Sequence, residues 1–179
     1  MTSTYRHRAG RFQTEPAPVL TVSPHLWFDH SATEAVAFYL SVFPDSEVLN
    51  GSIPRNRPGD ALRHDSESMH VIDFRIGDLH LTAFNGGPHH EFNDSISLAV
   101  ICPTQDEVDA VWSALSAGEG NALSCGWVRD KYGVSWQIVP AGLGDLLGHP
   151  DPRKAKRAVG ALLGMTKIVL ADIEAAMDP

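Results

Sequence analysis

The chain has 179 residues, a formal net charge of −8 at pH 7, 43% hydrophobic residues and 20% charged residues. This composition provides enough apolar surface for one compact domain or for two small modules that share a core. The excess of acidic side chains repels phosphate backbones and anionic lipid surfaces, so we expect neither nucleic acid nor a membrane as a partner. No segment approaches the roughly 20 apolar residues of a membrane span, and the N-terminus lacks the apolar core of a secretory signal. A cytoplasmic location is therefore expected, and Cys102 and Cys125, which have no CxxC spacing, predict neither a disulfide framework nor a thiolate zinc site.

Composition changes along the chain predict three parts. Residues 1–18 combine Arg and Pro without a hydrophobic period, which is typical of a flexible tail. Residues 19–140 alternate between strand and helix patterns and carry the main fold. Residues 141–179 read as a C-terminal helical extension, in which Asp151 can cap a helix that has Pro152 at its first position.

The first half of the main fold predicts the order strand, helix, strand, strand, strand. Ser31 or Thr33 can cap the helix, and Gly77-Asp78 is a hairpin turn signal between the last two strands. The segment 54–68 is rich in Pro, Gly and charge and predicts a mobile loop. The expected elements are a strand at 24–29, a helix at 33–43 and strands at 46–53, 68–76 and 79–84.

The second half repeats this order. A strand is expected at 95–102 and an amphipathic helix at 104–118, where Thr104 and Glu107 match a capping box. Strands near 122–130 and 133–140 follow. The repeated order predicts an α+β protein built from two βαβββ units.

Several segments together resemble the PhnB-like branch of the vicinal oxygen chelate superfamily, which includes glyoxalase I, bleomycin-resistance proteins and extradiol dioxygenases. The resemblance spans residues 22 to about 175. It implies paired βαβββ modules at about 22–88 and 93–140, a curved, barrel-like mixed sheet around a small-molecule cleft, and a homodimer, but no single reaction. The segments are PHLWFD, TEAVAFYLSVFPDSEV, LTAFNGG, FNDSISLAV, CGWVRDKYGVSWQIVP and KAKRAVGALLGMTKI.

In metal-dependent members of this superfamily, the resemblance implies one ligand on the first strand and one on the last strand of each module. His25 stands at the first of these places. The expected carboxylate of the first module is missing around Thr82, Ser95 replaces a second histidine, and Gln137 replaces the last carboxylate. Hydroxyl and amide oxygens are weak ligands for zinc, nickel or iron(II). We therefore expect no metal and no other cofactor.

Strand alternation predicts which side chains face the cleft. His25 and His80 are the candidate general acids or bases, although a single histidine in a small domain is more often a structural group. If Arg75 also faces the cleft, it can anchor a carboxylate or phosphonate of the ligand. Trp27 fits the core and the cleft equally well. The predicted ligand-contacting residues are Trp27, Arg75, Thr82, Phe84, Ser95, Ser97 and Gln137.

Three functions remain open at this point. The first is a metal-independent enzyme acting on a small oxygenated metabolite through His25 or His80. The second is a noncatalytic protein that sequesters a drug or metabolite, as the resemblance to bleomycin-resistance proteins implies. The third is a divalent-metal enzyme, such as a glyoxalase-like isomerase or lyase, with a partly water-ligated ion held by His25 and its neighbours.

One label attached to this family is 3-demethylubiquinone methyltransferase. Methyl transfer from S-adenosylmethionine normally requires a glycine-rich turn between a strand and a helix of a doubly wound sheet. Here NGG at 85–87 leads into a loop that contains Pro, and GALLG at 160–164 lies inside an expected helix. The residues do not support that label.

Overall fold

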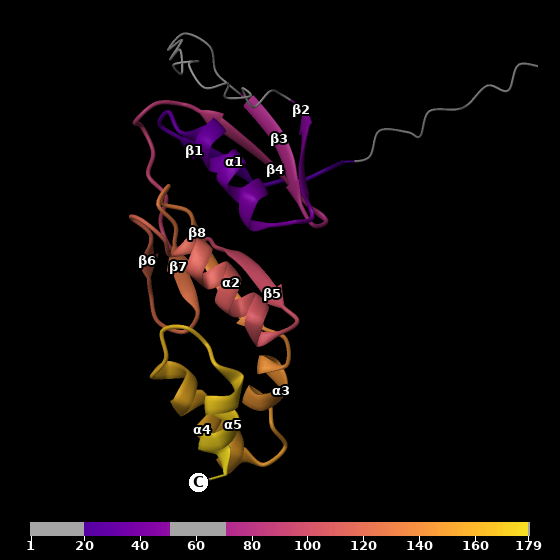
Figure 1. Cartoon of the computed structure of the whole chain (residues 1–179), viewed down its shortest axis with the longest axis vertical. Coiled ribbons are helices and arrows are strands. Elements are labelled where there is room, and N and C mark those ends of the chain that lie inside the picture. The colour runs from indigo at the N-terminus through magenta and orange to yellow at the C-terminus, as the bar shows by residue number, and fades with distance from the viewer. Residues whose placement is uncertain (1–19, 51–70, 179) are drawn as a thin grey trace, which may run out of the picture.

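The computed structural model describes residues 20–50 and 71–178. The predicted tail at 1–18 and the predicted loop at 54–68 lie outside these residues. The described chain forms two modules followed by a group of helices, arranged one after another along the long axis of the molecule (Figure 1). None of the helices among the described residues is long and apolar enough to cross a membrane.

The first module has the predicted βαβββ order. Its elements are β1 (His25–Phe28), α1 (Ala32–Val42), β2 (Ser46–Asn50), β3 (Val71–Ile76) and β4 (Leu79–Asn85). The strands form a four-stranded sheet in the order β1-β4-β3-β2, in which β1 runs parallel to β4 and the other pairs are antiparallel. The predicted turn at Gly77-Asp78 closes the β3–β4 hairpin, and Gly77 has the positive φ of 55° that glycine adopts without strain.

The second module repeats this topology. Its elements are β5 (Leu98–Cys102), α2 (Gln105–Leu115), β6 (Asn121–Ala122), β7 (Trp127–Arg129) and β8 (Ser135–Pro140). The sheet order is β5-β8-β7-β6, and β5 runs parallel to β8 as β1 does to β4. The predicted α+β class with two βαβββ modules is confirmed, with each module forming its own four-stranded mixed sheet.

The two module helices begin in different ways. In α2, Thr104 and Glu107 form the predicted capping box in both directions. In α1, Ser31 stands at the N-cap but its side chain makes no capping hydrogen bond. The Asn85 side chain at the end of β4 accepts from the Ala32 amide at 2.9 Å instead. The sequence expectation of a Ser31 or Thr33 side-chain cap was wrong, because a residue distant in sequence supplies the acceptor.

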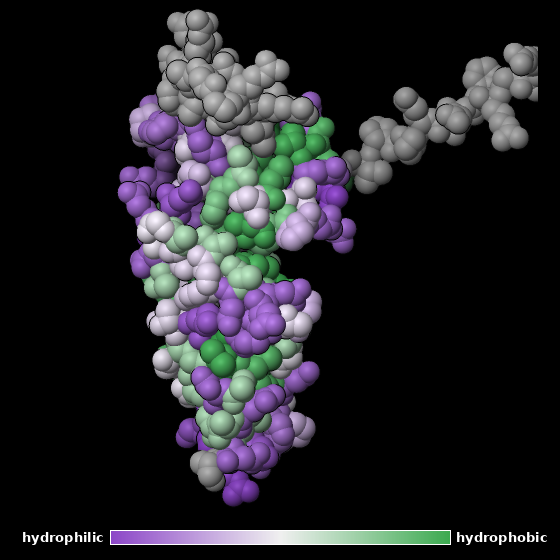
Figure 2. All heavy atoms as spheres, in the orientation of Figure 1, coloured by the Kyte–Doolittle hydropathy of each residue, from purple (hydrophilic) through white to green (hydrophobic). Residues whose placement is uncertain are grey.

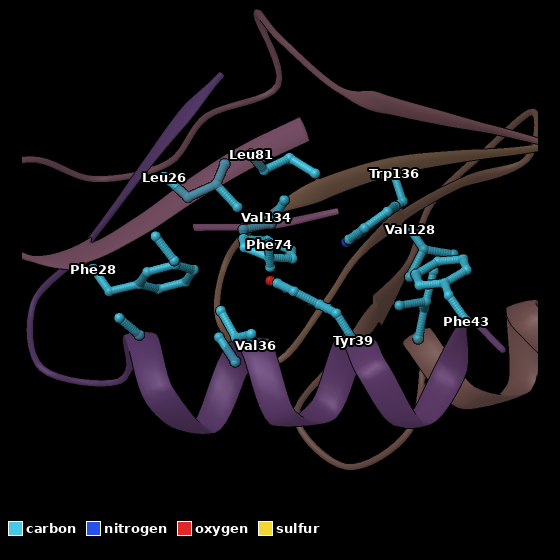
Figure 3. Packing of buried hydrophobic residues seen from close by; sticks show 14 of the residues in the cluster. Leu26, Phe28, Val36, Tyr39, Phe43, Phe74, Leu81, Val128, Val134 and Trp136 are labelled. Atoms are coloured by element: carbon cyan, nitrogen blue, oxygen red, sulfur yellow. The ribbon is translucent and has the colours of Figure 1, made fainter. Parts of the chain in front are cut away.

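One hydrophobic core joins both modules (Figure 3). Alternation along the strands points Leu26 and Phe28 of the first sheet and Trp136 and Ile138 of the second sheet to the helix side, where all four are buried. Tyr39 of α1 lies between the sheets, and its ring makes an edge contact with Trp136 at a centroid distance of 5.3 Å. The helix of the first module therefore packs against the sheet of the second.

A buried carboxylate reinforces this junction. Asp130, in the β7–β8 turn, is 3% exposed and accepts hydrogen bonds from Tyr39 Oη at 2.9 Å and Trp136 Nε1 at 2.8 Å. Its second oxygen accepts from the amides of Tyr132 and Val134, which fixes the turn. Burial raises the pKa of Asp130, while these hydrogen bonds act in the opposite direction. Asp130 thus ties the two modules together through a group that water does not reach.

The C-terminal helices are α3 (Leu143–Leu147), α4 (Pro152–Leu163) and α5 (Leu170–Met177). Asp151 caps α4 as predicted, by accepting from the Arg153 amide. These helices share a second hydrophobic cluster and are fastened to the second module by Gln105, which bonds to the backbone of Ile168 and Leu170.

Candidate functional site

The open face of the first sheet, on the side away from α1, carries polar and aromatic side chains in three cross-strand rows. The buried residues Leu26, Ile72 and Leu81 face α1, so their neighbours along each strand point to the open face. The rows are Trp27–Phe84–Val71, His25–Thr82–Asp73 and His80–Arg75–Glu47. The predicted alternation on β1 and β4 is therefore correct.

The open face of the second sheet has a matching pattern with different residues. The two parallel ladders end alike, at Phe28–Asn85 and Cys102–Pro140, and Gly86 and Ala141 donate their amides to the Phe28 and Cys102 carbonyls, so Ala99 is the register equivalent of His25. The same alignment makes Gln137 the equivalent of Thr82, and Ser135 the equivalent of His80. Of the candidate site residues, Thr82 and Gln137 thus stand at equivalent positions, whereas His25 and Ser97 do not.

The sequence-based placement of Ser95 on the cleft face of a strand is wrong. The strand β5 begins at Leu98, and Ser95 lies in an exposed turn where its amide donates to Asn93 Oδ1 at 2.9 Å. Ile96, which alternation in a strand from residue 95 would place on the buried face, is 69% exposed. The predicted strand started three residues too early because a turn led by Asn93 and Asp94 replaces its first part.

A cavity of about 210 Å³ lies where β1 and the start of β5 come together. Figure 2 shows apolar residues extending across the first module toward the waist between the two modules. His25 and Trp27 line the cavity from the first module, and Ser97 and Ser135 line it from the second. The other lining residues are Pro24, Leu26, His90, Glu91, Phe92, Asn93, Ile96, Leu98 and Val134. Three of the predicted site residues, His25, Trp27 and Ser97, thus meet in one cavity.

Trp27 is held firmly at the cavity wall. Its indole nitrogen donates to the carbonyl of Gly87 at 2.9 Å. The ring makes edge contacts with Phe84 and His90 at centroid distances of 5.0 and 4.7 Å. Gly86 lies flat against the indole, since a Cβ there would be 2.2 Å from the ring. The structure therefore places Trp27 in the cavity wall and not in the core.

Two serines of the second module have fixed hydrogen-bonding partners. Ser135, which is 2% exposed, donates to Asp94 Oδ1 at 2.6 Å, and Arg129 binds the other oxygen of Asp94. These two contacts, the Ser135 hydroxyl first, lower the pKa of Asp94. Ser97 Oγ accepts from the Gln137 amide at 2.6 Å. Gln137 thus acts by orienting Ser97.

Asp94, Arg129, Ser135, His90 and Glu91 were not among the predicted site residues. Alternation along β7 and β8 places Arg129 and Ser135 on the open face, so strand periodicity is the signal that could have found these two. Nothing in the sequence pattern indicates that the turn containing Asp94 reaches them.

Five predicted residues lie on the open faces but not in the cavity lining, namely Thr82, Phe84, His80 and Arg75 on the first sheet and Gln137 on the second. Thr82 is 8% exposed and donates to Asp73 Oδ1 at 2.7 Å, beside His25. Phe84 contacts the cavity only through Trp27 and His25. His80 is exposed and pairs with Arg75 across the strands.

Arg75 is engaged elsewhere. Its guanidinium binds Asp45 at 2.7 Å and Glu47 at 2.9 Å, on the open face of the first sheet, and it is not a lining residue. Arg75, which was predicted to anchor an acidic ligand, is therefore already paired with two carboxylates, one on β2 and one just before it.

The metal that the superfamily resemblance implies does not fit the described residues. No group of three His, Cys, Asp or Glu side chains that could hold an ion occurs among residues 20–50 and 71–178. His25 shares the cavity lining with Ser97, and the Thr82 and Ser135 hydroxyls give their protons to carboxylates. One imidazole with hydroxyls is a poor ligand set for a transition metal.

Comparison with known proteins agrees with the fold. The family model described as 3-demethylubiquinone-9 3-methyltransferase matches residues 20–139. The chain belongs to this PhnB-like family of the vicinal oxygen chelate superfamily. The PhnB protein of Bacillus cereus is 30% identical, with a TM-score of 0.55 over 68% of this chain and 100% of that one. A Pseudomonas aeruginosa protein is 19% identical, with a TM-score of 0.52 over 68% of this chain and 98% of that one. No curated protein matches the chain.

The family model is described as a methyltransferase, but the described residues do not form a binding site of the kind that S-adenosylmethionine requires. Gly86 of the NGG segment packs against Trp27, and GALLG forms the end of α4 and the glycine after it. Neither glycine segment forms a turn between a strand and a helix of a parallel sheet, which is the context that nucleotide cofactors require. The described residues therefore do not fit that cofactor.

Proposed function

We propose that the cavity between β1 and β5 binds a small, ring-shaped oxygenated molecule, and that His25 acts on it as a general acid or base. The observation that carries this proposal is the convergence of His25, Trp27 and Ser97, from two modules, on one cavity. A cavity of about 150 Å³ is sufficient to hold benzene, so a volume of about 210 Å³ suits one substituted ring. The fixed indole of Trp27 provides a flat apolar wall for such a ring.

Native mass spectrometry of the freshly purified chain tests this proposal by detecting any co-purified small molecule. We expect a bound compound in the unaltered protein and its loss in Trp27→Ala, because the cavity loses one wall. Trp127→Ala is the matched control, since Trp127 lies on the open face of the second sheet and does not line the cavity. Retention of the compound in Trp27→Ala would place its site elsewhere.

Binding without chemistry is the second candidate function. It is favoured by the position of His80, the other imidazole expected in the cleft, which does not line the cavity. The two functions differ in what happens to the bound compound. After incubation with excess protein, a catalyst yields a chemically changed compound, whereas a sequestering protein returns it unchanged. If the compound is changed at equal rates by the unaltered protein and His25→Ala, the catalytic role of His25 is wrong.

Pairing of two chains is also a proposal. Val159 and Leu163, four residues apart on α4, are 41% and 68% exposed, which leaves an apolar strip that the chain itself does not cover. A second copy provides an apolar surface of the same kind. Light scattering at micromolar concentration is expected to give the mass of a dimer, and Leu163→Glu is expected to shift it to a monomer. A monomer in the unaltered protein would refute the pairing.

A further inference from the structure

The hydrogen-bonding polarity of the cavity follows from the partners of its hydroxyl groups. A carboxylate only accepts hydrogen bonds, so the bond between Ser135 and Asp94 commits the Ser135 proton to Asp94. The Ser135 oxygen, which is buried at the cavity wall, can then offer only lone pairs to a ligand.

The first module has a similar hydroxyl–carboxylate pair next to the cavity. Thr82 gives its proton to Asp73 Oδ1 at 2.7 Å and is the cross-strand neighbour of His25. Thr82 itself does not line the cavity, so the Ser135 oxygen is the acceptor that a ligand can reach.

The charges around the cavity point the same way. Among its described lining residues, Glu91 is the one with a formal charge at neutral pH when histidine is counted as neutral, and there is no Lys or Arg. Arg129 lies behind Ser135, but Asp94 neutralises it. The Nε of Arg129 is enclosed and has no hydrogen-bond partner among the described residues. A ligand carboxylate would thus meet Glu91 and the proton-poor Ser135 oxygen without a cation to pair with, and the Ser97 hydroxyl, which accepts from Gln137, is the hydroxyl that keeps its own proton among the described lining residues.

We propose that the cavity selects a ring that carries hydrogen-bond donors, such as hydroxyl or amine groups, over a carboxylate of the same size. This selectivity rests on the proposed function of the cavity and specifies its ligand class. The sequence-based expectation that Arg75 anchors a carboxylate or phosphonate is replaced by the Ser135 acceptor oxygen, which requires a donor. His25 lines the same cavity as Ser135 and can exchange a proton with the donor group of the ligand.

Titration of the full chain with phenol, anisole and sodium benzoate tests this proposal, with the Trp27 indole N–H signal as the NMR reporter. Phenol and anisole have similar rings but differ in the donor, while benzoate adds an anion. We expect phenol to bind at least about tenfold more tightly than anisole or benzoate, which is the effect of about one hydrogen bond. Benzoate or anisole binding as tightly as phenol would overturn the selectivity and leave the proposed cavity function intact. If no probe moves the Trp27 signal, both the function and the selectivity fail.

Two variants separate polarity from simple loss of shape. Ser135→Ala removes the acceptor without releasing Arg129 from Asp94, and is expected to weaken phenol binding about tenfold while leaving anisole unchanged. Asp94→Ala frees both the Ser135 proton and Arg129, and is expected to reverse the preference toward benzoate. Ser41→Ala is the control, because Ser41 is exposed on α1 and bonds only to the carbonyl of Phe38. An unchanged order of phenol and benzoate in Asp94→Ala would overturn the proposal.

Discussion

The two modules have the same strand order and register, yet they differ strongly on one face. On the helix side both sheets carry large apolar residues that meet in one core. On the open side, the first module has His25 and Trp27 where the second has Ala99 and Ile101, and the second module brings Ser97 and Ser135 to the cavity instead. The core constrains one face of each sheet through packing, whereas the other face can vary without loss of the fold. The first module thus supplies rings to the cavity and the second supplies hydroxyls.

Breaking the junction between the modules is expected to have the largest effect. Asp130→Ala leaves the Tyr39 hydroxyl, the Trp136 indole and two turn amides without their acceptor in a buried site. We expect a loss of about 3 kcal/mol or more in the free energy of unfolding, measured by urea denaturation. Tyr39→Phe removes one of these donors and is expected to cost about 1 kcal/mol. Equal stability of Asp130→Ala and the unaltered protein would show that this carboxylate does not join the modules.

The same residue sets a pH dependence. Burial raises the pKa of Asp130, so the folded state holds this proton more tightly than the unfolded state. The stability that Asp130 contributes through protonation is fully present below the unfolded pKa of about 3.9 and is lost as pH rises through the raised folded value. In the unaltered protein the free energy of unfolding is therefore expected to decrease as pH rises above about 4, and in Asp130→Ala this decrease is expected to be absent. A fall of the same size in the variant would assign it to other groups.

Displacing Trp27 tests the part of the first module that the second lacks. In Gly86→Ala the new Cβ would be 2.2 Å from the indole, so the ring must move and lose its bond to Gly87. We expect a shifted indole N–H signal and at least about tenfold weaker ligand binding, the effect of about one lost contact group. Gly160→Ala is the control, because nothing lies within 4 Å of its Cβ position in α4. An unchanged indole signal in Gly86→Ala would show that the wall is not rigid.

Sequence reasoning predicted the framework well because alternation and helix caps are local signals. The buried faces of β1 and β8, the capping box at Thr104 and the Gly77 turn each follow from residues near one another in sequence. The same reasoning identified His25 and Trp27 on the open face, since a strand's period of two needs no tertiary information.

The parts that sequence reasoning missed depend on contacts between distant residues. Asn85 caps α1 from the end of β4, and Asp94 reaches Arg129 and Ser135 from a turn. Arg75 was expected to bind a ligand, but its position between Asp45 and Glu47 depends on the pairing of β2 with β3. No local pattern specifies which of several acidic residues an arginine will meet.

The exposed histidines of β1 and β4, His25 and His80, offer a matched comparison. His25 lines the cavity, while His80, two positions from Thr82 on the adjacent strand, does not. We expect His25→Ala to weaken binding of phenol, or to abolish conversion of a co-purified compound, and His80→Ala to leave both unchanged. Calorimetric titration of both variants measures the difference. Equal losses in the two would extend the site along the open face of the first sheet.

The smallest effect is expected at Arg75. Its partners Asp45 and Glu47 have side chains that are 77% and 58% exposed, so water and salt screen both ion pairs. Arg75→Ala is expected to leave the melting temperature almost unchanged, and more so at high salt, and to leave probe binding in the cavity unaffected. The unaltered protein and Arg75→Ala should therefore bind phenol and benzoate with the same preference. If the variant instead loses affinity for benzoate alone, Arg75 reaches an anionic ligand after all, and the first module contributes a charge to the site in addition to its rings.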